Sequence, residues 1–437
     1  MEKVSPATTR VYQVFLERPL ALILGILVLG AARLWTRGRS ELRLPPQPPA
    51  TPILGHLPEV IRENRARRWH LRLNEWAMEY GPICGVRTGY IVDYYINSDH
   101  MVKNQRKVIQ QLLTSVQQAD KIIPLIEYET LKFLRDNVCD PNGGLSGARL
   151  YQDIGRYTYS AFATAITGMD VPNADDDVIE FLKDTFPGSN IIDLIPGLGR
   201  LPLCLKPWEK KGRARYRRDL EWSMKRLRTV EKRIEGGDSS LGKTFLAAVL
   251  SHNDLKGMSG REEVAVLSLA LIVAAADTSR MTTWAFLEAM MMFPDVQAKA
   301  QEEVDRAVGD RIPSFDDYTR IPYIRMTMKE VWRWRPPVAL GHPHITSRDM
   351  QVGQYHLPKG SRLHINAYAI GHDPERHTEP DRFWPERYED DNTTTMESIN
   401  SQDPTKRDHF AFGAGRRVCK SPPIVFPSLS ILLTGRC

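Results

Sequence analysis

A proline-free stretch from Ser259 to Phe293 limits the possible folds of this 437-residue chain more than any other feature. At about 1.5 Å per residue, its roughly 33 residues would make a helix about 50 Å long. Ser259 with Glu262 three residues later has the pattern of a capping box, and Pro294 ends the stretch. Residues 264–276 are apolar on nearly every face, which predicts a helix buried inside a large core.

Polar residues interrupt this helix near its middle. Three alanines, residues 274–276, are followed by Asp277, Thr278 and Ser279. An acid and two hydroxyls inside a buried helix are costly unless they are paired, and a threonine can bond back to the carbonyl four residues earlier. The small alanines would also let a flat cofactor and a diatomic ligand come close. These three polar residues therefore either form hydrogen bonds within the helix itself or belong to a reactive site.

A second short segment, residues 412–419, ends on a lone cysteine. It reads Phe-Gly-Ala-Gly-Arg-Arg-Val-Cys. A thiolate needs positive charge or a metal beside it, and glycines allow the backbone amides to turn toward the sulfur. A tight loop that holds one sulfur toward an iron is what a haem-thiolate site requires. The alternative is a glycine turn beside a buried structural cysteine.

Between these segments lies a predicted helix, Tyr323 to Trp334, which Pro336 and Pro337 terminate. It places Glu330 and Arg333 on one face. Residues 350–368 alternate and are predicted to form a strand pair that turns at residues 358–360. The sequence Phe-Trp-Pro-Glu-Arg-Tyr follows at residues 383–388.

In order and spacing, these motifs of residues 259–419 resemble those of the cytochrome P450 family. The resemblance implies a mainly α fold with a small β region, and a haem cofactor whose iron is bound by the thiolate of Cys419. Phe412, Gly415 and Arg417 match the rest of the ligand loop, and His344 matches a position that often reaches a haem propionate; a surface histidine is the alternative.

The resemblance also implies roles for the helix residues. Thr278 would order the water that protonates bound dioxygen, and Asp277 would connect that water to a proton supply. A buried charge triad would lock the core beside the haem, and its members are Glu330, Arg333 and Arg387.

The chain departs from the family pattern at three places. Ala275 stands where the family has glycine, and the long loop expected near residue 100 is missing. After Cys419, Ser421 replaces a glycine, and three prolines at 422, 423 and 427 leave no helix of useful length. We therefore expect the chain as written to bind haem poorly. A truncated non-catalytic relative and a haem-thiolate isomerase or dehydratase are the alternatives to an active monooxygenase.

The N-terminal region predicts a membrane anchor. Residues 1–18 precede an apolar segment, 19–35, and a basic, proline-rich linker, 36–55, leads into a haem-binding domain, 56–437. Arginines after the apolar segment place that domain in the cytoplasm, which predicts a single-pass protein of the endoplasmic reticulum membrane. A cleaved signal peptide is the alternative, since the apolar segment is short and ends in small residues.

The expected activity is that of a fungal microsomal monooxygenase, which inserts one oxygen atom of O2 into a lipophilic small molecule, in the style of secondary metabolism. The sequence contains no Gly-rich dinucleotide fingerprint and no iron–sulfur cysteine set, so a separate protein must supply the electrons. The resemblance implies that this partner is an NADPH-dependent flavoprotein reductase. A net charge of +6 without zinc-ligand spacing or an RNA-binding signature indicates no nucleic-acid partner. Four further cysteines at scattered positions predict ordinary thiols: Cys84, Cys139, Cys204 and Cys437.

Overall fold

A computed structural model of the chain describes residues 48–49, 51, 56–66, 68–80, 86, 109, 111–112, 116–137, 147–171, 206–311 and 314–419. Four predictions lie outside these residues: the membrane anchor at 19–35, the missing loop near residue 100, the altered segment after Cys419, and the ordinary thiols at Cys84, Cys139, Cys204 and Cys437. The predicted fold class is confirmed, because the described chain is mainly helical with a few short strands.

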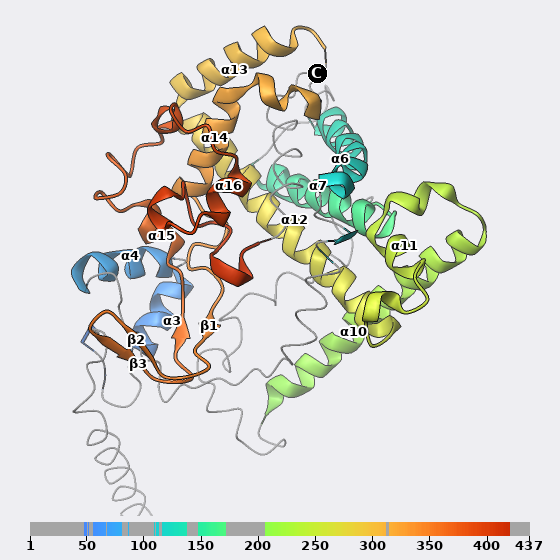
Figure 1. The fold of residues 1–437 in the computed structure, drawn as a ribbon, viewed down its shortest axis with the longest axis horizontal. Coiled ribbons are helices and arrows are strands. Elements are labelled where there is room, and N and C mark those ends of the chain that lie inside the picture. The colour runs from blue at the N-terminus through green and yellow to red at the C-terminus, as the bar shows by residue number, and fades with distance from the viewer. Residues whose placement is uncertain are drawn as a thin grey trace, which may run out of the picture.

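The long buried helix exists as α12 (Arg261–Met292) and runs through the centre of the molecule (Figure 1). Its start differs from the predicted capping box. The helix begins after Gly260, so Ser259 lies one residue further out, and both its N–H and its hydroxyl donate to Glu263, each at 2.7 Å, rather than to Glu262. Within the described residues, α12 is the one helix whose length and apolar content would suit a membrane span, and half of that apolar stretch is buried.

Helices that precede α12 in the chain cover one side of it. α7 (Gly147–Thr167) packs along it, α6 (Val116–Asn137) packs on α7, and α10 (Pro207–Glu235) crosses α12 near its start (Figure 1). α11 (Phe245–Leu250) fills the corner between α7 and α10. Earlier in the chain lie α3 (Leu57–Arg65) and α4 (Trp69–Tyr80).

The second half supplies α13 (Pro294–Val308), α14 (Pro322–Trp334), α15 (Ala367–Gly371) and α16 (Thr395–Asn400). Short 3-10 turns lie before α12, at η3 (Ser239–Lys243) and η4 (Leu255–Gly257), and after it, at η5 (Phe315–Arg320), η6 (Pro385–Tyr388), η7 (Pro404–Lys406) and η8 (Gly415–Arg417). The predicted helix 323–334 is thus present as α14, which contacts α12, α13 and η6.

Two antiparallel strand pairs form the β region. β2 (Met350–Val352) pairs with β3 (Tyr355–Leu357), and β1 (His344–Ile345) pairs with β4 (Arg362–Leu363). The hairpin turns at Gly353, whose φ of +56° suits the first residue of a type II′ turn, and not at residues 358–360 as predicted. The Pro358–Gly360 turn joins β3 to β4 instead.

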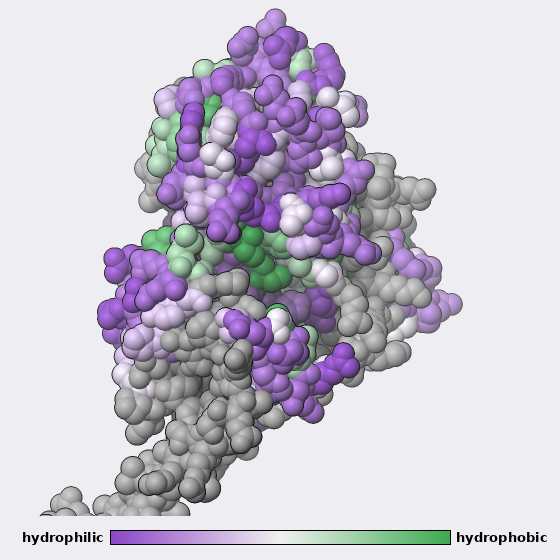
Figure 2. All heavy atoms as spheres, turned by 60° about the vertical axis from the view of Figure 1, so that its left-hand side comes forward, coloured by the Kyte–Doolittle hydropathy of each residue, from purple (hydrophilic) through white to green (hydrophobic). Residues whose placement is uncertain are grey.

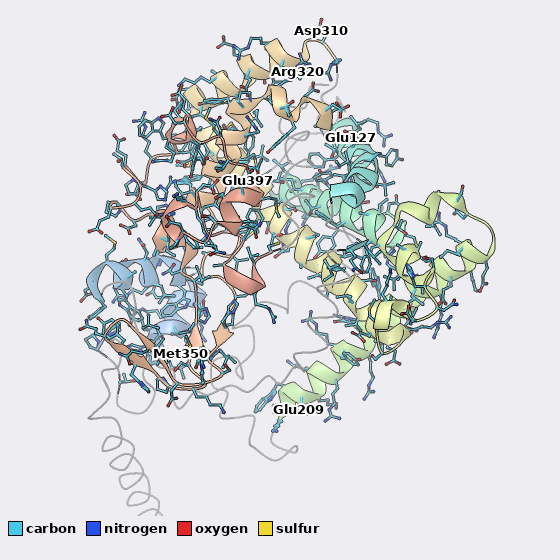
Figure 3. All side chains as sticks on the ribbon, in the orientation of Figure 1. Glu127, Glu209, Asp310, Arg320, Met350 and Glu397 are labelled. Carbon is cyan, nitrogen blue, oxygen red and sulfur yellow. The ribbon has the colours of Figure 1, made fainter. Side chains whose placement is uncertain are left out.

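One apolar core joins the two halves. It extends from α6 and α7 through α12 to α14, and Ala411 and Phe412 pack against it. Figure 2 shows hydrophobic side chains in a hollow between two hydrophilic regions of one face. Exposed charged side chains such as Asp310 and Arg320 lie toward the top of Figure 3.

Candidate haem-binding site

The cysteine loop is a backbone structure that two glycines make possible. Gly413 and Gly415 have φ angles of +75° and +65°, a region that L side chains rarely adopt. A Cβ atom at either position would meet nothing within 4 Å, so the conformation, and not the space, requires glycine. The Cys419 amide donates to the Phe412 carbonyl at 2.9 Å and closes the loop. Cys419 itself is a reduced, half-buried thiol.

An aromatic group supports the base of this loop. The Phe412 ring meets the buried Trp332 of α14 edge-on, with centroids 5.0 Å apart. The buried His409 ring lies 5.4 Å from Trp332 and 5.6 Å from Phe412. Burial lowers the pKa of His409 to about 4, although Asp408 acts in the opposite direction, so the imidazole is neutral at pH 7.

The polar interruption of α12 is satisfied within the helix at Asp277 and Thr278, whereas the buried Ser279 hydroxyl has no hydrogen-bond partner among the described residues. The Thr278 hydroxyl donates to the Ala274 carbonyl at 2.9 Å, and Thr282 and Thr283 repeat the same bond one turn on. Asp277 pairs with Arg280 at 2.6 Å. Burial raises the pKa of Asp277, and the Arg280 guanidinium offsets this only in part.

Arg280 is a functional candidate that the sequence reasoning missed. Its guanidinium lies 4.8 Å from the centroid of the Tyr151 ring on α7, and its side chain runs close to Gly155, where a Cβ atom would lie 3.3 Å from Arg280 Cδ. The spacing of three residues between Asp277 and Arg280 was the available signal, since residues three apart share one helix face.

The structure brings Glu330, Arg333 and Arg387 together in the core. Arg333 forms two bonds to the Glu330 carboxylate, at 2.7 and 2.8 Å, and Arg387 Nε lies 3.1 Å from both carboxylate oxygens. Arg333 also donates to the Gly371 and Pro380 carbonyls at 2.6 and 2.8 Å. The Glu330 and Arg333 side chains are completely buried, so α14 fixes two distant segments of the chain.

His344 and Arg417 are both exposed, and His344 belongs to β1. Nearby, burial lowers the pKa of His364, and repulsion from Arg362, His342 and His344 lowers it further. The β1–β4 pair therefore gathers several basic groups. A cluster of this kind suits two carboxylates, which is what a haem would present, and sequence reasoning identified only His344 among its members.

A family model for cytochrome P450 matches residues 94–420. This chain belongs to the cytochrome P450 family. It is 41% identical to a cytochrome P450 monooxygenase of Gibberella fujikuroi, over 92% of this chain and 83% of the relative. It is 32% identical to the cytochrome P450 monooxygenase virE of Hypocrea virens, over 94% and 81% of the two chains. The cytochrome P450 monooxygenase fsoB of Humicola fuscoatra is 26% identical over 95% and 84%.

Family membership confirms the predicted enzyme class and cofactor: a haem-dependent oxidoreductase that uses O2, a redox partner and a lipophilic substrate. The described residues of this P450 fit haem. A half-buried thiol closes a glycine loop, an aromatic group supports that loop, and basic side chains gather on the β1–β4 pair.

Proposed function

We propose that this P450 is a membrane-anchored monooxygenase of fungal secondary metabolism, with Cys419 as the axial ligand of its haem iron. The substrate R–H, O2, two electrons and two protons would give R–OH and water. The observation that carries the proposal is the loop geometry: two glycines at positive φ and the bond between the Cys419 amide and the Phe412 carbonyl hold one reduced thiol at a fixed place.

Several residues would hold the haem. Cys419 would bind the iron, and Phe412 and Trp332 would keep water away from the sulfur side of the loop. His344 and Arg417 would bind the propionates. When bound, the haem supplies the redox chemistry that cleaves O2, which the thiolate favours by donating electron density.

Proton delivery would depend on α12. The Thr278 hydroxyl donates its own proton to the Ala274 carbonyl, and its oxygen can still accept a bond from a water molecule. Asp277 has a raised pKa, which brings its protonation closer to neutral pH, as a proton donor requires. Because Arg280 holds the Asp277 carboxylate, that pair must loosen before Asp277 can pass a proton toward Thr278.

Electrons would come from an NADPH-dependent flavoprotein reductase in the endoplasmic reticulum membrane. The apolar segment 19–35 followed by arginines supports a single-pass anchor with the catalytic domain in the cytoplasm. An anchor of this kind would bring the enzyme close to a lipophilic substrate dissolved in the bilayer. The fungal relatives named above support a substrate from secondary metabolism.

The reduced, CO-bound absorption spectrum tests the role of Cys419. We expect a thiolate-type Soret band from the haem-loaded fraction of the full chain, a fraction that the segment after Cys419 should keep small, and loss of that band in Cys419→Ser. Cys84→Ser and Cys204→Ser are matched controls that should keep the band. A thiolate band that survives Cys419→Ser would reject the proposal, as would its absence from the haem-loaded wild type. NADPH and O2 consumption with the reductase then separates a monooxygenase from an isomerase or dehydratase, which needs neither.

A further inference from the structure

Beside the Glu330–Arg333 pair, α14 carries a second pair of buried side chains, Lys329 and Trp332. Lys329 and Trp332 are three residues apart and therefore neighbours on the helix surface. Lys329 is the one buried lysine among the described residues, with only 6% of its side chain exposed. Burying an ammonium group is costly unless charged or hydrogen-bonding partners surround it. The contacts of Lys329 therefore identify the segments that this side of α14 binds.

Lys329 binds two segments of the chain at once. Its Nζ atom lies 2.7 Å from Asp391 and 3.1 Å from Asp408, and it donates to the Thr393 carbonyl at 2.8 Å. The contacts with Asp391 and with the Thr393 carbonyl are hydrogen bonds, whereas the contact with Asp408 is an ion pair. The Asp408 side chain is 1% exposed, and the hydrogen bonds that Asp391 accepts from Lys329 and Thr393 outweigh burial and lower its pKa. The lowered pKa keeps the Asp391 carboxylate charged beside the cation.

A short series of contacts leads from Asp408 to the cysteine. His409, the next residue, packs against the rings of both Trp332 and Phe412. The Phe412 carbonyl then accepts the bond from the Cys419 amide. The residues that link the Lys329 ammonium to Cys419 are all buried or half-buried. Both His409 and Phe412 pack against Trp332 of α14.

We propose that Lys329 and Trp332 form a clamp that positions the segment from Asp408 to Cys419, separately from the Glu330 triad. The triad holds residues 371–387, whereas the clamp holds residues 391–393 and 408–412. Lys329 is thereby a positioning residue for the sulfur. This inference rests on the proposed role of Cys419.

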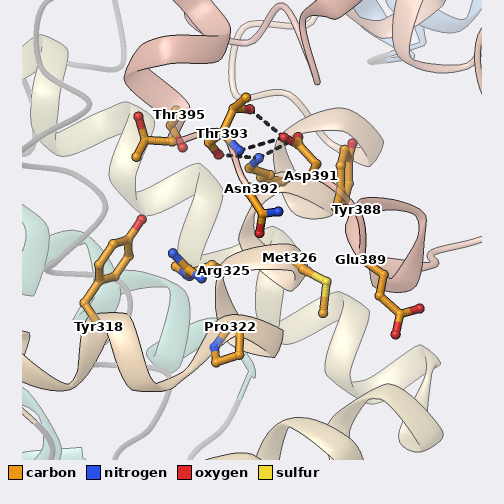
Figure 4. Close-up of a pocket in the computed structure, with 12 residues that line it drawn as sticks. Tyr318, Pro322, Arg325, Met326, Tyr388, Glu389, Asp391, Asn392, Thr393 and Thr395 are labelled. Carbon is orange, nitrogen blue, oxygen red and sulfur yellow. Dashed lines mark hydrogen bonds and ion pairs between the residues drawn. The ribbon is translucent and has the colours of Figure 1, made fainter.

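A surface pocket of about 260 Å³ lies directly over the clamp, and Lys329, Asp391 and Thr393 belong to its wall. Figure 4 shows Asp391 bonded to Thr393 on this wall, with Asn392 between them. The pocket lets water approach one side of the ion cluster, so the clamp is expected to open when its charges are unbalanced.

Hydrogen exchange measured by mass spectrometry on the full chain can test the clamp. The variants are Lys329→Met, Asp408→Asn and the double variant, which removes both charges and leaves neither Lys329 nor Asp408 as an unpaired ion. Lys299→Met is the matched control, because Lys299 also pairs with a carboxylate, Glu386, but lies at the surface.

In Lys329→Met and in the double variant, we expect the amides of residues 408–419 to exchange at least about tenfold faster. The amides of α12 and of residues 371–387 should keep their wild-type rates, as should all amides in Lys299→Met. Unchanged exchange in 408–419 would overturn the inference, and so would an equal acceleration of α12 and the triad segment, which would mean general destabilisation.

The absorption spectrum of the same haem-loaded proteins provides a second measurement. We expect the double variant to lose at least about half of the thiolate-type band and to gain the band of a protonated or displaced thiol, at a haem content close to that of the wild type. A wild-type-like thiolate band in the double variant would contradict positioning by Lys329. If the proposed function is wrong, the thiolate-type band will be absent from the wild type. The hydrogen-exchange measurement tests the clamp independently of that result.

Discussion

α12 and α14 both carry polar residues through the apolar core, but they satisfy them in opposite ways. On α12, Thr278 bonds to a carbonyl of its own helix, and Asp277 pairs three residues away with Arg280. On α14, Glu330 accepts bonds from Arg387 and from the Trp384 amide, which are 57 and 54 residues away in the chain.

This difference separates residues that hold the fold from residues that are available for chemistry. A group that is satisfied inside one helix can be exchanged or moved without disturbing another segment. A group that joins distant segments cannot move without releasing them, and a buried ion that loses its partner is strongly destabilising. The predictions below test this contrast, from the largest expected effect to the smallest.

Glu330→Gln should destabilise the protein most. The change leaves Arg333 and Arg387 without a buried counter-charge, at a cost of about 3–5 kcal/mol in the free energy of unfolding. Urea unfolding followed by circular dichroism would measure it. Glu386→Gln is the matched control, since Glu386 pairs with the exposed Lys299, and its loss should cost no more than about 1 kcal/mol. Similar costs for the two changes would contradict the contrast.

His409→Phe should change how stability depends on pH. The folded pKa of His409 is lowered to about 4, below the value of about 6.5 in an unfolded chain, so only the unfolded state takes up a proton as the pH falls through this window. Stability is therefore fully present above pH 6.5 and decreases toward pH 4, by up to about 1.4 kcal/mol per pH unit.

Phenylalanine keeps the ring contacts with Trp332 and Phe412 but cannot bind a proton. The variant should therefore lose less stability than the wild type between pH 6.5 and 4. His377, whose pKa is lowered to about 3, titrates in both proteins and so cancels in the comparison. Parallel pH profiles of the unfolding free energy would show that His409 is not buried as a neutral group.

Thr278→Val should have a small effect on stability and a large effect on coupling. Valine keeps the shape of threonine, and the lost bond to Ala274 is worth about 0.5–1.5 kcal/mol. Haem content should stay near that of the wild type, while a larger share of the NADPH electrons should appear as hydrogen peroxide. Thr283→Val is the control, because Thr283 forms the same type of bond to Ser279. Equal coupling in the two variants would reject a catalytic role for Thr278.

Glu263→Ala should have the smallest effect. It removes two bonds to Ser259 at the partly exposed start of α12, which are worth about 0.5–1 kcal/mol together. Glu262→Ala, one position earlier, should be within about 0.5 kcal/mol of the wild type. Thermal unfolding of the two variants would distinguish the observed cap from the capping box that the sequence pattern predicted.

Local patterns predicted the elements of this fold well. The proline-free stretch specified α12 to within two residues at each end, and the spacing of Glu330 and Arg333 placed both on one face of α14. Contacts between distant segments were harder to predict. No local spacing in the sequence relates Lys329 to Asp408, because tertiary packing decides which partner a buried charge meets.

The same limit explains the two errors of detail. The hairpin turns at Gly353, since glycine readily adopts the positive φ that this turn requires. The Pro-Lys-Gly sequence at 358–360 is equally suited to a turn, but it forms the next connection. The sequence pattern could not decide between two such turns. Glu262 and Glu263 are likewise equivalent in a capping pattern until the first residue of the helix is known.

Gly371 shows how the buried triad restricts the sequences that this enzyme can adopt. A Cβ atom there would lie 2.6 Å from the Arg333 carbonyl oxygen, and the Gly371 carbonyl is itself an acceptor for the Arg333 guanidinium. A larger residue would therefore push the backbone away and remove an acceptor from a buried cation in one step. We expect position 371 to tolerate no side chain in active homologues that keep the triad, so this single glycine would mark the triad in sequences of unknown structure.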